Sequence, residues 1–355
     1  MGDHPVLFIP GPTEVDEELR RILAEPLIGH REERFVAVVR DVCTRLCDLY
    51  LTKEPAAFET CPATALMEAG IRNFVPRGAR SLHLVCGAFS ERWQQIASAC
   101  GRTAEPLTVP LGRAHDPDAL RARLRNGPPV AAVAITHNET ATGVLEPLRD
   151  LAHVVRTEAP DALVLVDVVT SVGGAELRFD DWGLDFAFAG TQKCLALPPG
   201  LCTYTASGRA LRRAATVDER GFLLDLPRAI AETNDGKTLA TPCVPLVFAL
   251  QRQLERVAAE GLPARQARHL AMRDTTLAWA ASRGMRAFVA DPAHRSPTVS
   301  CIDAAGQDVD AMSKRAAGGG FKIDKGYGTL RGVAFRIGHM GDHTVDRVRA
   351  LLAAM

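Results

Sequence analysis

The chain has 355 residues, of which 47% are hydrophobic and 24% charged, so it can build two domains with sizeable cores. Lysine and arginine together number 42, as do aspartate and glutamate, and the net charge is zero. This balance argues against nucleic acid or an anionic membrane as a generic partner. It leaves room for a local basic pocket that binds a small anion.

The nine cysteines predict a reduced, cytoplasmic protein. Their number is odd and no Cys-x-x-Cys occurs, which is not the pattern of a disulfide framework. The N-terminus from Met1 to Val6 has no basic segment followed by an apolar run. The apolar runs at 130–135 and 162–166 are far shorter than the roughly 20 residues needed to span a bilayer. We therefore expect neither an export signal nor a membrane segment.

The predicted elements begin with an N-terminal arm, residues 1–15. A helix should follow Asp16, an N-cap residue, because acidic residues and then apolar residues at helical spacing come after it: Glu17, Glu18, Leu19, Ile22 and Leu23. From there to about residue 206, helical stretches alternate with short β-rich runs, at 81–85, 130–136, 163–169, 185–189 and 202–205. This alternation predicts βα units and a largely parallel sheet with helices on both faces.

The second part of the chain predicts a smaller α+β domain. A long helix over residues 245–260, which Gly261 is placed to end, would connect the two parts. The elements expected beyond it are a helix at 264–281, strands at 298–302 and 333–337, and a final helix after Thr344. The sequence thus predicts an α/β protein of three parts: an arm of residues 1–15, a large domain of residues 16–260 and a small domain of residues 261–355.

Two residues at the ends of predicted buried strands are candidates for catalysis. Asp167 ends the apolar run at 163–166, and ligands of open α/β sheets bind at the carboxyl ends of their strands. Lys193 follows the strand at 185–189 among small and apolar neighbours, where burial can lower its pKa and favour Schiff-base chemistry. The alternatives are a helix cap or a loop ion pair for Asp167 and an ordinary solvated side chain for Lys193. An aspartate for a pyridine nitrogen and a lysine for an aldimine are the minimal equipment of a pyridoxal phosphate enzyme.

Five segments, in order over nearly the whole chain, resemble the class V aminotransferases, especially the alanine/serine–glyoxylate group. They are residues 8–13 (FIPGPT), 136–143 (THNETATG), 166–167 (VD), 190–193 (GTQK) and 335–339 (FRIGH). The resemblance implies a fold type I pyridoxal phosphate-dependent transferase. Its large domain would have a mainly parallel sheet of the seven-stranded type flanked by helices, and its smaller C-terminal domain would be α+β.

The resemblance also implies a role for each matching residue. Lys193 would hold pyridoxal 5'-phosphate as an aldimine and shuttle the substrate proton, while Asp167 would keep the ring nitrogen protonated. Arg336 would bind the substrate α-carboxylate through a bidentate pair. The remaining cofactor contacts would be Phe89 on the ring face, Thr140 at the ring hydroxyl, Gln192 at the phosphate, and Thr241 at the phosphate of the neighbouring subunit. Thr241 would make the protein a homodimer with active sites at its interface.

The phosphate-binding turn departs from the family pattern. Family members usually have Ser-Gly-Thr or Ser-Gly-His before a helix, whereas this chain reads Thr60-Cys61-Pro62-Ala63-Thr64-Ala65. Pro62 has no N–H to offer a phosphate. We expect a modified cup in which Ala63, Thr64 and Ala65 present backbone amides and a hydroxyl.

The implied reaction moves an amino group from a small amino acid of the alanine or serine type to a 2-oxoacid such as glyoxylate or pyruvate, by ping-pong chemistry. Phosphoserine is an alternative donor, because His30, Arg31 or His339 could supply further cations. Another pyridoxal phosphate reaction, of the desulfurase or lyase type, is less favoured, because desulfurases carry histidine where this chain has Gln192. A further alternative is that the chain is a non-catalytic binding protein, and only the altered turn at Thr60–Thr64 supports it.

Two further motifs carry no function in this interpretation. Gly236-Lys237-Thr238 lacks the earlier glycine of a phosphate-binding P-loop, since Ala231 stands there. His339, Asp342 and His343 are expected in a loop with a helix cap, because Gly341 and the absence of a helical pattern do not suit a metal site. We expect no metal.

Overall fold

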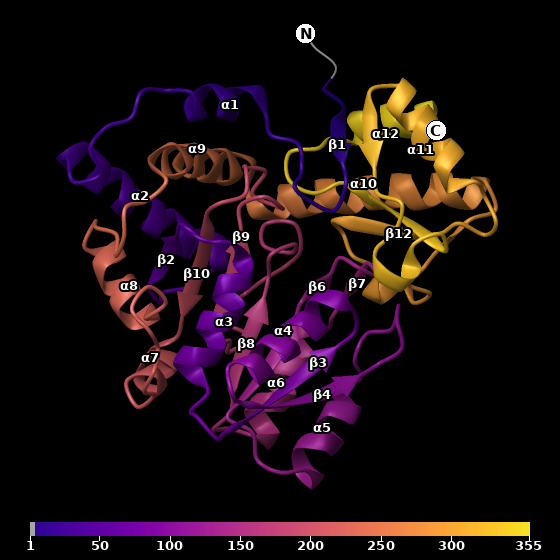
Figure 1. Ribbon diagram of the computed structural model, residues 1–355. Helices are drawn as coiled ribbons and strands as arrows, with labels where there is room; N and C mark the ends of the chain where they lie inside the picture. The colour runs from indigo at the N-terminus through magenta and orange to yellow at the C-terminus, as the bar shows by residue number, and fades with distance from the viewer. Residues whose placement is uncertain (1–3) are drawn as a thin grey trace.

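The computed structural model describes residues 4–355, so residues 1–3 of the predicted arm lie outside it. A seven-stranded sheet in the order β2-β10-β9-β8-β5-β3-β4 forms the centre of the larger part (Figure 1). All its pairs are parallel except those of β10, which runs antiparallel to both neighbours. The predicted mainly parallel sheet is confirmed. In chain order its strands are β2 (Ala56–Glu59), β3 (Arg80–Val85), β4 (Thr103–Thr108), β5 (Ala132–Thr136), β8 (Leu163–Asp167), β9 (Phe186–Gly190) and β10 (Cys202–Ala206).

Helices cover both faces of this sheet. Val164 and Val166 of β8 belong to one hydrophobic core, and Leu163 and Leu165 belong to the core on the opposite face. Strands buried on both sides therefore read as continuous apolar runs. The helices of this part are α1 (Glu17–Leu23), α2 (Glu33–Tyr50), α3 (Ala63–Phe74), α4 (Ala88–Ala99), α5 (Pro117–Asn126), α6 (Leu148–Glu158), α7 (Gly208–Ala214), α8 (Leu226–Asn234) and α9 (Val244–Glu260).

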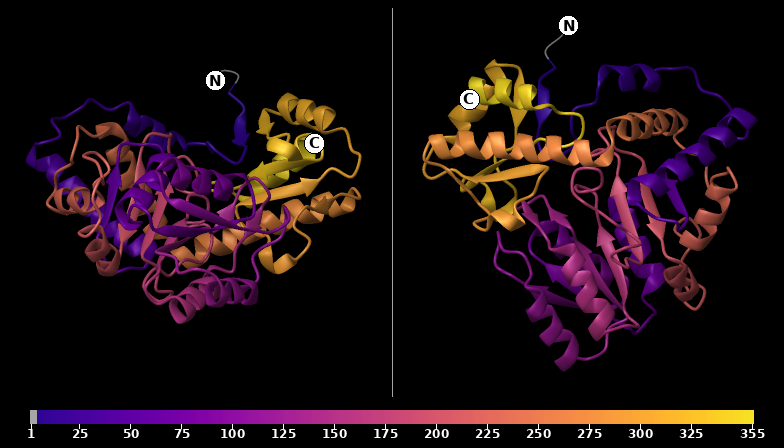
Figure 2. Two further views of the ribbon diagram at one scale, coloured as in Figure 1. Left: turned by 60° about the horizontal axis from the view of Figure 1, so that its bottom comes forward. Right: turned by 180° about the vertical axis from the view of Figure 1, so that it is seen from behind.

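The C-terminal elements form a separate group beside the large sheet, coloured orange to yellow in Figures 1 and 2. An antiparallel sheet joins β11 (Arg286–Ala287), β12 (Val299–Asp303) and β14 (Ala334–Gly338), and its helices are α10 (Leu262–Ser282), α11 (Val309–Gly318) and α12 (Val345–Ala354). The N-terminal strand β1 (Val6–Phe8) pairs in parallel with β13 (Phe321–Ile323), so the first strand of the chain lies against this group. The short elements β6 (Asn138–Glu139), β7 (Val144–Leu145), η1 (Pro292–His294) and η2 (Gly328–Leu330) complete the fold.

The helix ends agree with the expected capping signals. The Asp16 carboxylate accepts a hydrogen bond from the N–H of Glu18, and Thr344 caps α12 in the same way through Arg347. Gly261, with φ of 79°, separates α9 from α10. The predicted domain boundary at residue 260 coincides with this break, and the division into three parts stays a prediction. No helix within residues 4–355 combines the length and apolar content that a membrane span requires.

Candidate active site

Asp167 and Lys193 meet at one edge of the large sheet. Asp167 is the last residue of β8, and Lys193 lies in the turn that follows β9. Because β8 and β9 are parallel neighbours, their carboxyl ends open onto the same edge. Both side chains line a cavity of about 280 Å³. The other predicted site residues that line this cavity are Ala63, Thr64, Phe89, Thr140 and Gln192.

Lys193 is half-buried and lies against the Pro10-Gly11-Pro12 segment. Its Nζ atom donates a hydrogen bond to the backbone oxygen of Pro10. Gly11 has φ of +108°, and a side chain at this position would collide with Lys193. Burial lowers the pKa of Lys193 to about 8, and the positive charge of Arg336 acts in the same direction. The lysine can therefore supply a neutral amine near neutral pH.

Asp167 has one carboxylate oxygen that the protein leaves without a donor. Its Oδ1 atom accepts the N–H of Val169 at 2.8 Å, and no described residue donates to Oδ2. Burial raises the pKa of Asp167 to about 7, although the Val169 hydrogen bond opposes this rise. A positively charged donor that entered the cavity would stabilise the ionised form.

Glu139 holds the start of α4, which carries Phe89. The Oε2 atom of Glu139 accepts the backbone N–H groups of Phe89 and Ser90, each at 3.0 Å, and the Ser90 hydroxyl at 3.1 Å. Lys193 Nζ lies 6.0 Å from the centroid of the Phe89 ring. The sequence interpretation missed Glu139, although the residue belongs to the segment 136–143. Its signal was a carboxylate in a segment of otherwise uncharged residues, where burial demands donors.

The altered turn before α3 presents two free amides to the cavity. Pro62 is the N-cap of α3, and no residue of the described chain accepts a hydrogen bond from the N–H of Ala63 or Thr64. Ala65 does not line the cavity, and its N–H is already donated to Pro62 O at 2.8 Å. The first amides of a helix bind anions because they have no partner within the helix. The geometry thus supports a phosphate cup at Ala63 and Thr64 without the Ala65 amide.

Arg336 lies in β14, beside the cavity, and is 4% exposed. Its Nε atom donates to Asp324 Oδ1 at 2.8 Å, and its Nη1 atom donates to the backbone oxygen of Thr140 at 2.9 Å. Nη2 has no acceptor among the described residues. The guanidinium is thus held by the protein on one side and keeps N–H groups for a ligand.

Thr241, like Ala65, is a predicted site residue that does not line the cavity of the single chain. It is exposed in the segment before α9 and lines a different groove together with His30 and Arg31. His339, the other cation considered for phosphoserine, is buried and bonded to the Ser300 hydroxyl. None of these three cations lines the cavity of the described chain.

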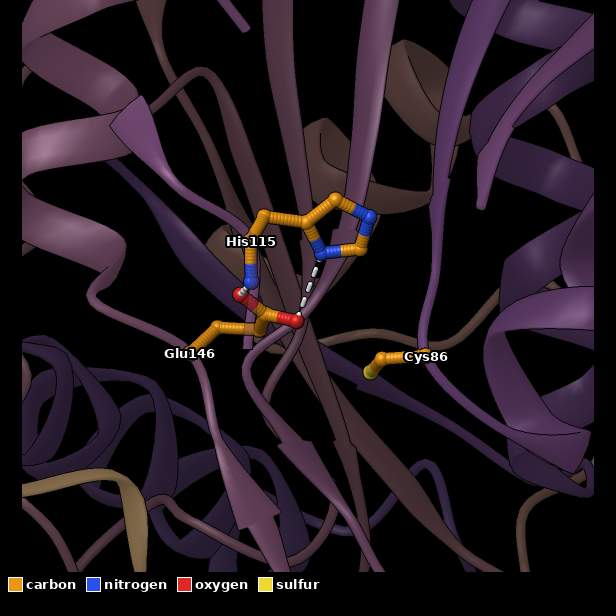
Figure 3. A group of neighbouring side chains, drawn as sticks. All are labelled: Cys86, His115 and Glu146. Atoms are coloured by element: carbon orange, nitrogen blue, oxygen red, sulfur yellow. Dashed lines mark hydrogen bonds and ion pairs between the residues drawn. The ribbon is translucent and has the colours of Figure 1, made fainter. Parts of the chain in front are cut away.

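A second cluster of polar side chains, Cys86, His115 and Glu146, is buried outside this cavity (Figure 3). His115 Nδ1 lies 2.8 Å from Glu146 Oε1, and Nε2 donates to the backbone oxygen of Leu107 at 2.8 Å. Burial opposes protonation of His115, but the hydrogen bond and charge of Glu146 outweigh it and raise the pKa. Each ring nitrogen and each carboxylate oxygen has a protein partner, so we interpret the cluster as an internal hydrogen-bond network.

A lysine and a buried aspartate that line one cavity at neighbouring strand ends of a doubly covered sheet are the two protein groups that a pyridoxal phosphate-dependent transferase requires. The aminotransferase class V family model matches residues 60–330, and the chain belongs to this family. The chain is 34% identical to the small subunit of a soluble hydrogenase from Synechococcus sp. PCC 6716, over 96% of this chain and 89% of the relative.

Two further comparisons connect the chain to aminotransferases. It is 29% identical to a serine–glyoxylate aminotransferase from Methylorubrum extorquens, over 95% of this chain and 86% of the relative. The solved structure of an aspartate aminotransferase from Thermus thermophilus superimposes on this chain with a TM-score of 0.91 and a sequence identity of 30%. The match covers 98% of this chain and 97% of the Thermus chain. The predicted fold and family are confirmed.

The cavity fits pyridoxal phosphate. Besides the undonated oxygen of Asp167 and the two free amides, Thr136 Oγ1 and Asn138 Oδ1 are buried without a partner in the described chain, and both residues line the cavity. Buried polar atoms are normally hydrogen-bonded, so unpaired atoms that face a cavity indicate a polar ligand. The protein is a pyridoxal phosphate-dependent aminotransferase.

Proposed function

We propose that the protein transfers the amino group of a small amino acid, of the alanine or serine type, to a 2-oxoacid such as glyoxylate or pyruvate. The observation that carries this proposal is the convergence of Lys193, Asp167 and Arg336 on one cavity region. The relative named for serine and glyoxylate supports this choice of substrates. Phosphoserine is the less favoured donor, because none of the three cations considered for it, His30, Arg31 and His339, lines the cavity.

Each residue has a task in this proposal. Pyridoxal phosphate, when bound, supplies an electron-accepting ring that stabilises negative charge at the substrate Cα. Lys193 Nζ takes the proton from that Cα, because its lowered pKa leaves a neutral amine available. Asp167 holds a proton at the ring nitrogen through its free carboxylate oxygen. Arg336 binds the α-carboxylate and so fixes which bond of Cα faces the lysine.

The cofactor is held by groups that the protein has in place. Phe89 covers one face of the ring and excludes water from it. Thr140 binds the ring hydroxyl, and Gln192 binds the phosphate together with the amides of Ala63 and Thr64. The predicted role of the Ala65 amide is not part of this proposal, because that group is bonded to Pro62.

A homodimer completes the proposed site. Thr241 is exposed and does not line the cavity of its own chain, which leaves it free to serve a second copy. Sedimentation should give twice the chain mass, and Thr241→Ala should weaken cofactor binding. A monomer that binds the cofactor with full affinity would contradict this arrangement. The nine cysteines, all unpaired in the structure, support a reducing compartment such as the cytoplasm.

The experiment that tests the function is a half-reaction with single substrates. The cofactor-loaded protein is mixed with alanine, serine, aspartate or phosphoserine, and the visible absorption shows which amino acid converts the cofactor to its amine form. Glyoxylate, pyruvate and 2-oxoglutarate are then added to the amine form. We expect alanine or serine, and glyoxylate or pyruvate, to react fastest. Failure of every amino acid would contradict the proposal.

A further inference from the structure

Tyr327 packs against both Phe89, which lines the cavity, and Arg336. Its ring lies nearly parallel to that of Phe89, with 5.8 Å between the centroids and 22° between the planes. The Arg336 guanidinium carbon lies 5.2 Å from the centroid of the Tyr327 ring. The Tyr327 hydroxyl accepts a hydrogen bond from Arg92 Nη2 at 3.2 Å. Tyr327 thus contacts two cavity-lining residues, Phe89 and Arg92, as well as the residue proposed to bind the substrate carboxylate.

Asp324 fixes the segment that carries Tyr327. Its Oδ1 atom accepts two hydrogen bonds, from the N–H of Gly326 at 2.9 Å and from Arg336 Nε at 2.8 Å. The backbones of Asp324 and Arg336 also pair, with N···O distances of 3.2 and 2.9 Å. Gly326 has φ of +98°, and a Cβ there would collide with the backbone oxygens of Leu330 and Ala334. The path of the chain into Tyr327 is therefore determined by contacts to the same arginine that Tyr327 covers.

The available space makes the position of this ring important. The cavity of about 280 Å³ lies at the lower end of the roughly 300–1,000 Å³ of typical ligand sites, and it has to hold the cofactor. An amino acid whose carboxylate is on Arg336 and whose amine is near Lys193 lies beside Phe89 and Tyr327. Tyr327 is 36% exposed, so it stands at the mouth of the site and not in the packed core. An amino acid with a longer side chain would therefore come into contact with the Tyr327 ring.

We propose that Tyr327 is a specificity-determining residue whose ring forms a wall of the amino-donor site and restricts the donor to a short side chain. The inference rests on the proposed transamination and adds a size limit to it. Arg92 and Asp324 are positioning residues, because they hold the hydroxyl and the chain of Tyr327 and touch no reacting atom.

The test compares donors of different length in Tyr327→Ala, Tyr327→Phe and wild type. The ratio of kcat/KM for norvaline to kcat/KM for alanine is measured in each cofactor-loaded protein. Tyr327→Ala should raise this ratio about tenfold or more, the scale on which pockets discriminate one or two methylene groups. Tyr327→Phe keeps the ring and should leave the ratio within about threefold of wild type. Val333→Ala changes an exposed side chain of the same segment and serves as the control.

Binding of unreactive carboxylates gives a second readout that does not depend on turnover. Calorimetry on the cofactor-loaded proteins should show that Tyr327→Ala tightens binding of pentanoate relative to propanoate, while Tyr327→Phe does not. The proposed role of Tyr327 would be wrong if Tyr327→Ala changed neither the norvaline-to-alanine ratio of kcat/KM nor the binding of pentanoate relative to propanoate. If the wild type converts no amino acid at all, the proposed function fails, and the carboxylate series still decides about Tyr327.

Discussion

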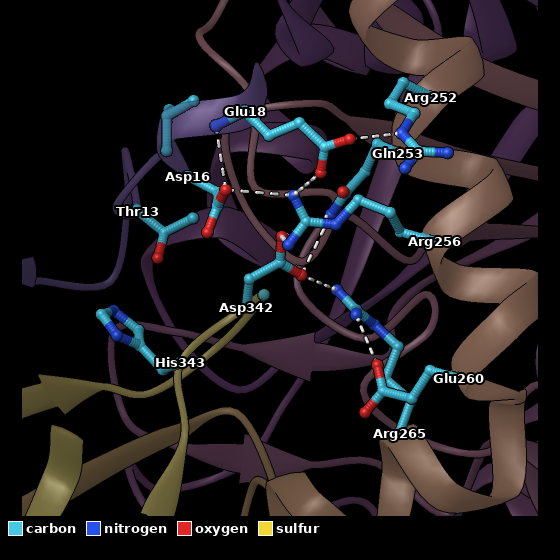
Figure 4. A network of polar contacts seen from close by, with 12 residues as sticks. Thr13, Asp16, Glu18, Arg252, Gln253, Arg256, Glu260, Arg265, Asp342 and His343 are labelled. Atoms are coloured by element: carbon cyan, nitrogen blue, oxygen red, sulfur yellow. Dashed lines mark hydrogen bonds and ion pairs between the residues drawn. The ribbon is translucent and has the colours of Figure 1, made fainter. Parts of the chain in front are cut away.

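Arg265 donates a hydrogen bond to the backbone oxygen of Cys194, the residue that follows Lys193, at 3.0 Å. Its guanidinium is 2% exposed and also pairs with Asp342 at 3.0 Å and Glu260 at 2.9 Å (Figure 4). These contacts link the turn of the lysine to the junction of α9 and α10 and to the loop before α12. One buried arginine therefore connects the large sheet with the C-terminal group.

We expect Arg265→Leu to destabilise the protein, because it leaves the Cys194 oxygen without this donor and Asp342 with Arg256 and Gln253 only. Removal of one partner from a buried ion pair that leaves the other uncompensated costs about 3–5 kcal/mol, and the remaining partners should keep the cost below this range. The measurement is urea unfolding of both proteins. Arg349→Ala, which removes an exposed pair with Asp346, is the matched control and should change the unfolding midpoint little. A similar midpoint for wild type and Arg265→Leu would show that the network adds no stability.

Asp167 makes the stability of the cofactor-free protein depend on pH. Folding raises its pKa from 3.8 to about 7, so the folded state holds a proton that the unfolded state has lost between these values. The contribution of Asp167 to the free energy of unfolding is fully present below pH 3.8 and is lost as the pH rises through about 7. The difference between the two pKa values corresponds to roughly 4 kcal/mol at most.

Asp167→Asn removes this titration, so the cofactor-free variant should gain stability over wild type as the pH rises from 5 to 8. Urea unfolding at both pH values checks the difference. Asp161→Asn, an exposed position, should show no such trend. The same variant should lose affinity for pyridoxal phosphate, because an amide cannot balance the charge of a protonated ring nitrogen. An equal difference at pH 5 and pH 8 would contradict the pKa argument.

The sequence predicted those parts of the fold in which local pattern and tertiary role agree. The apolar runs of β5, β8 and β9 are buried on both faces, and the capping residues Asp16 and Thr344 act through their own side chains. β2 and β4 were missed. β4 alternates between exposed and half-buried residues at the sheet edge, and β2 has only four residues, so neither gives a strong pattern.

Short motifs in the sequence singled out Lys193, Asp167 and Phe89, and the structure brings these three residues to one cavity, while their roles stay predictions. The contacts that support those residues are long-range: Glu139 reaches α4 from 50 residues away, and Arg336 reaches Thr140 across 196 residues. Asp324 and Tyr327 could not be predicted from the sequence. They belong to the segment between β13 and β14, which contacts Phe89 and Arg336 only in the folded chain. Sequence spacing does not encode such contacts, because they depend on how the two parts of the chain pack.

Glu139 should control cofactor affinity through the position of Phe89. Glu139→Gln places an amide N–H where the carboxylate now accepts hydrogen bonds from Phe89, Ser90 or Ala141, so at least one donor loses its acceptor. We expect about tenfold weaker binding of pyridoxal phosphate, measured by fluorescence titration, which corresponds to about 1.4 kcal/mol. Glu91→Gln, exposed on the same helix, is the control. Unchanged affinity would mean that the start of α4 is held by other contacts.

Arg336 should matter for every substrate, because all amino acids and 2-oxoacids share the carboxylate next to the reacting carbon. Arg336→Ala removes a charged donor and leaves Asp324 without its partner. Loss of one member of such a pair typically costs 2–5 kcal/mol, so KM should rise about 30-fold or more for donor and acceptor alike. Steady-state kinetics with two amino acids and two oxoacids checks this. A KM that rises for one substrate only would place Arg336 at the side chain instead.

The final prediction concerns the rate at which the cofactor-free protein attaches pyridoxal phosphate to Lys193. The neutral amine is the nucleophile, so the attachment rate should rise with pH and reach half its maximum near the lysine pKa of about 8. The charge of Arg336 helps to lower this pKa, so Arg336→Ala should move the midpoint to higher pH, and Arg336→Lys, which keeps the charge, should move it less.

Rapid mixing with borohydride quenching and intact-mass detection measures the covalent adduct. Lys193→Ala must give no adduct at this site, whereas Lys314→Ala, a change of an exposed lysine on α11, must behave as wild type. A wild-type midpoint near 10 would contradict the lowered pKa of Lys193, and a midpoint that is the same in Arg336→Ala and wild type would show that Arg336 does not contribute to it.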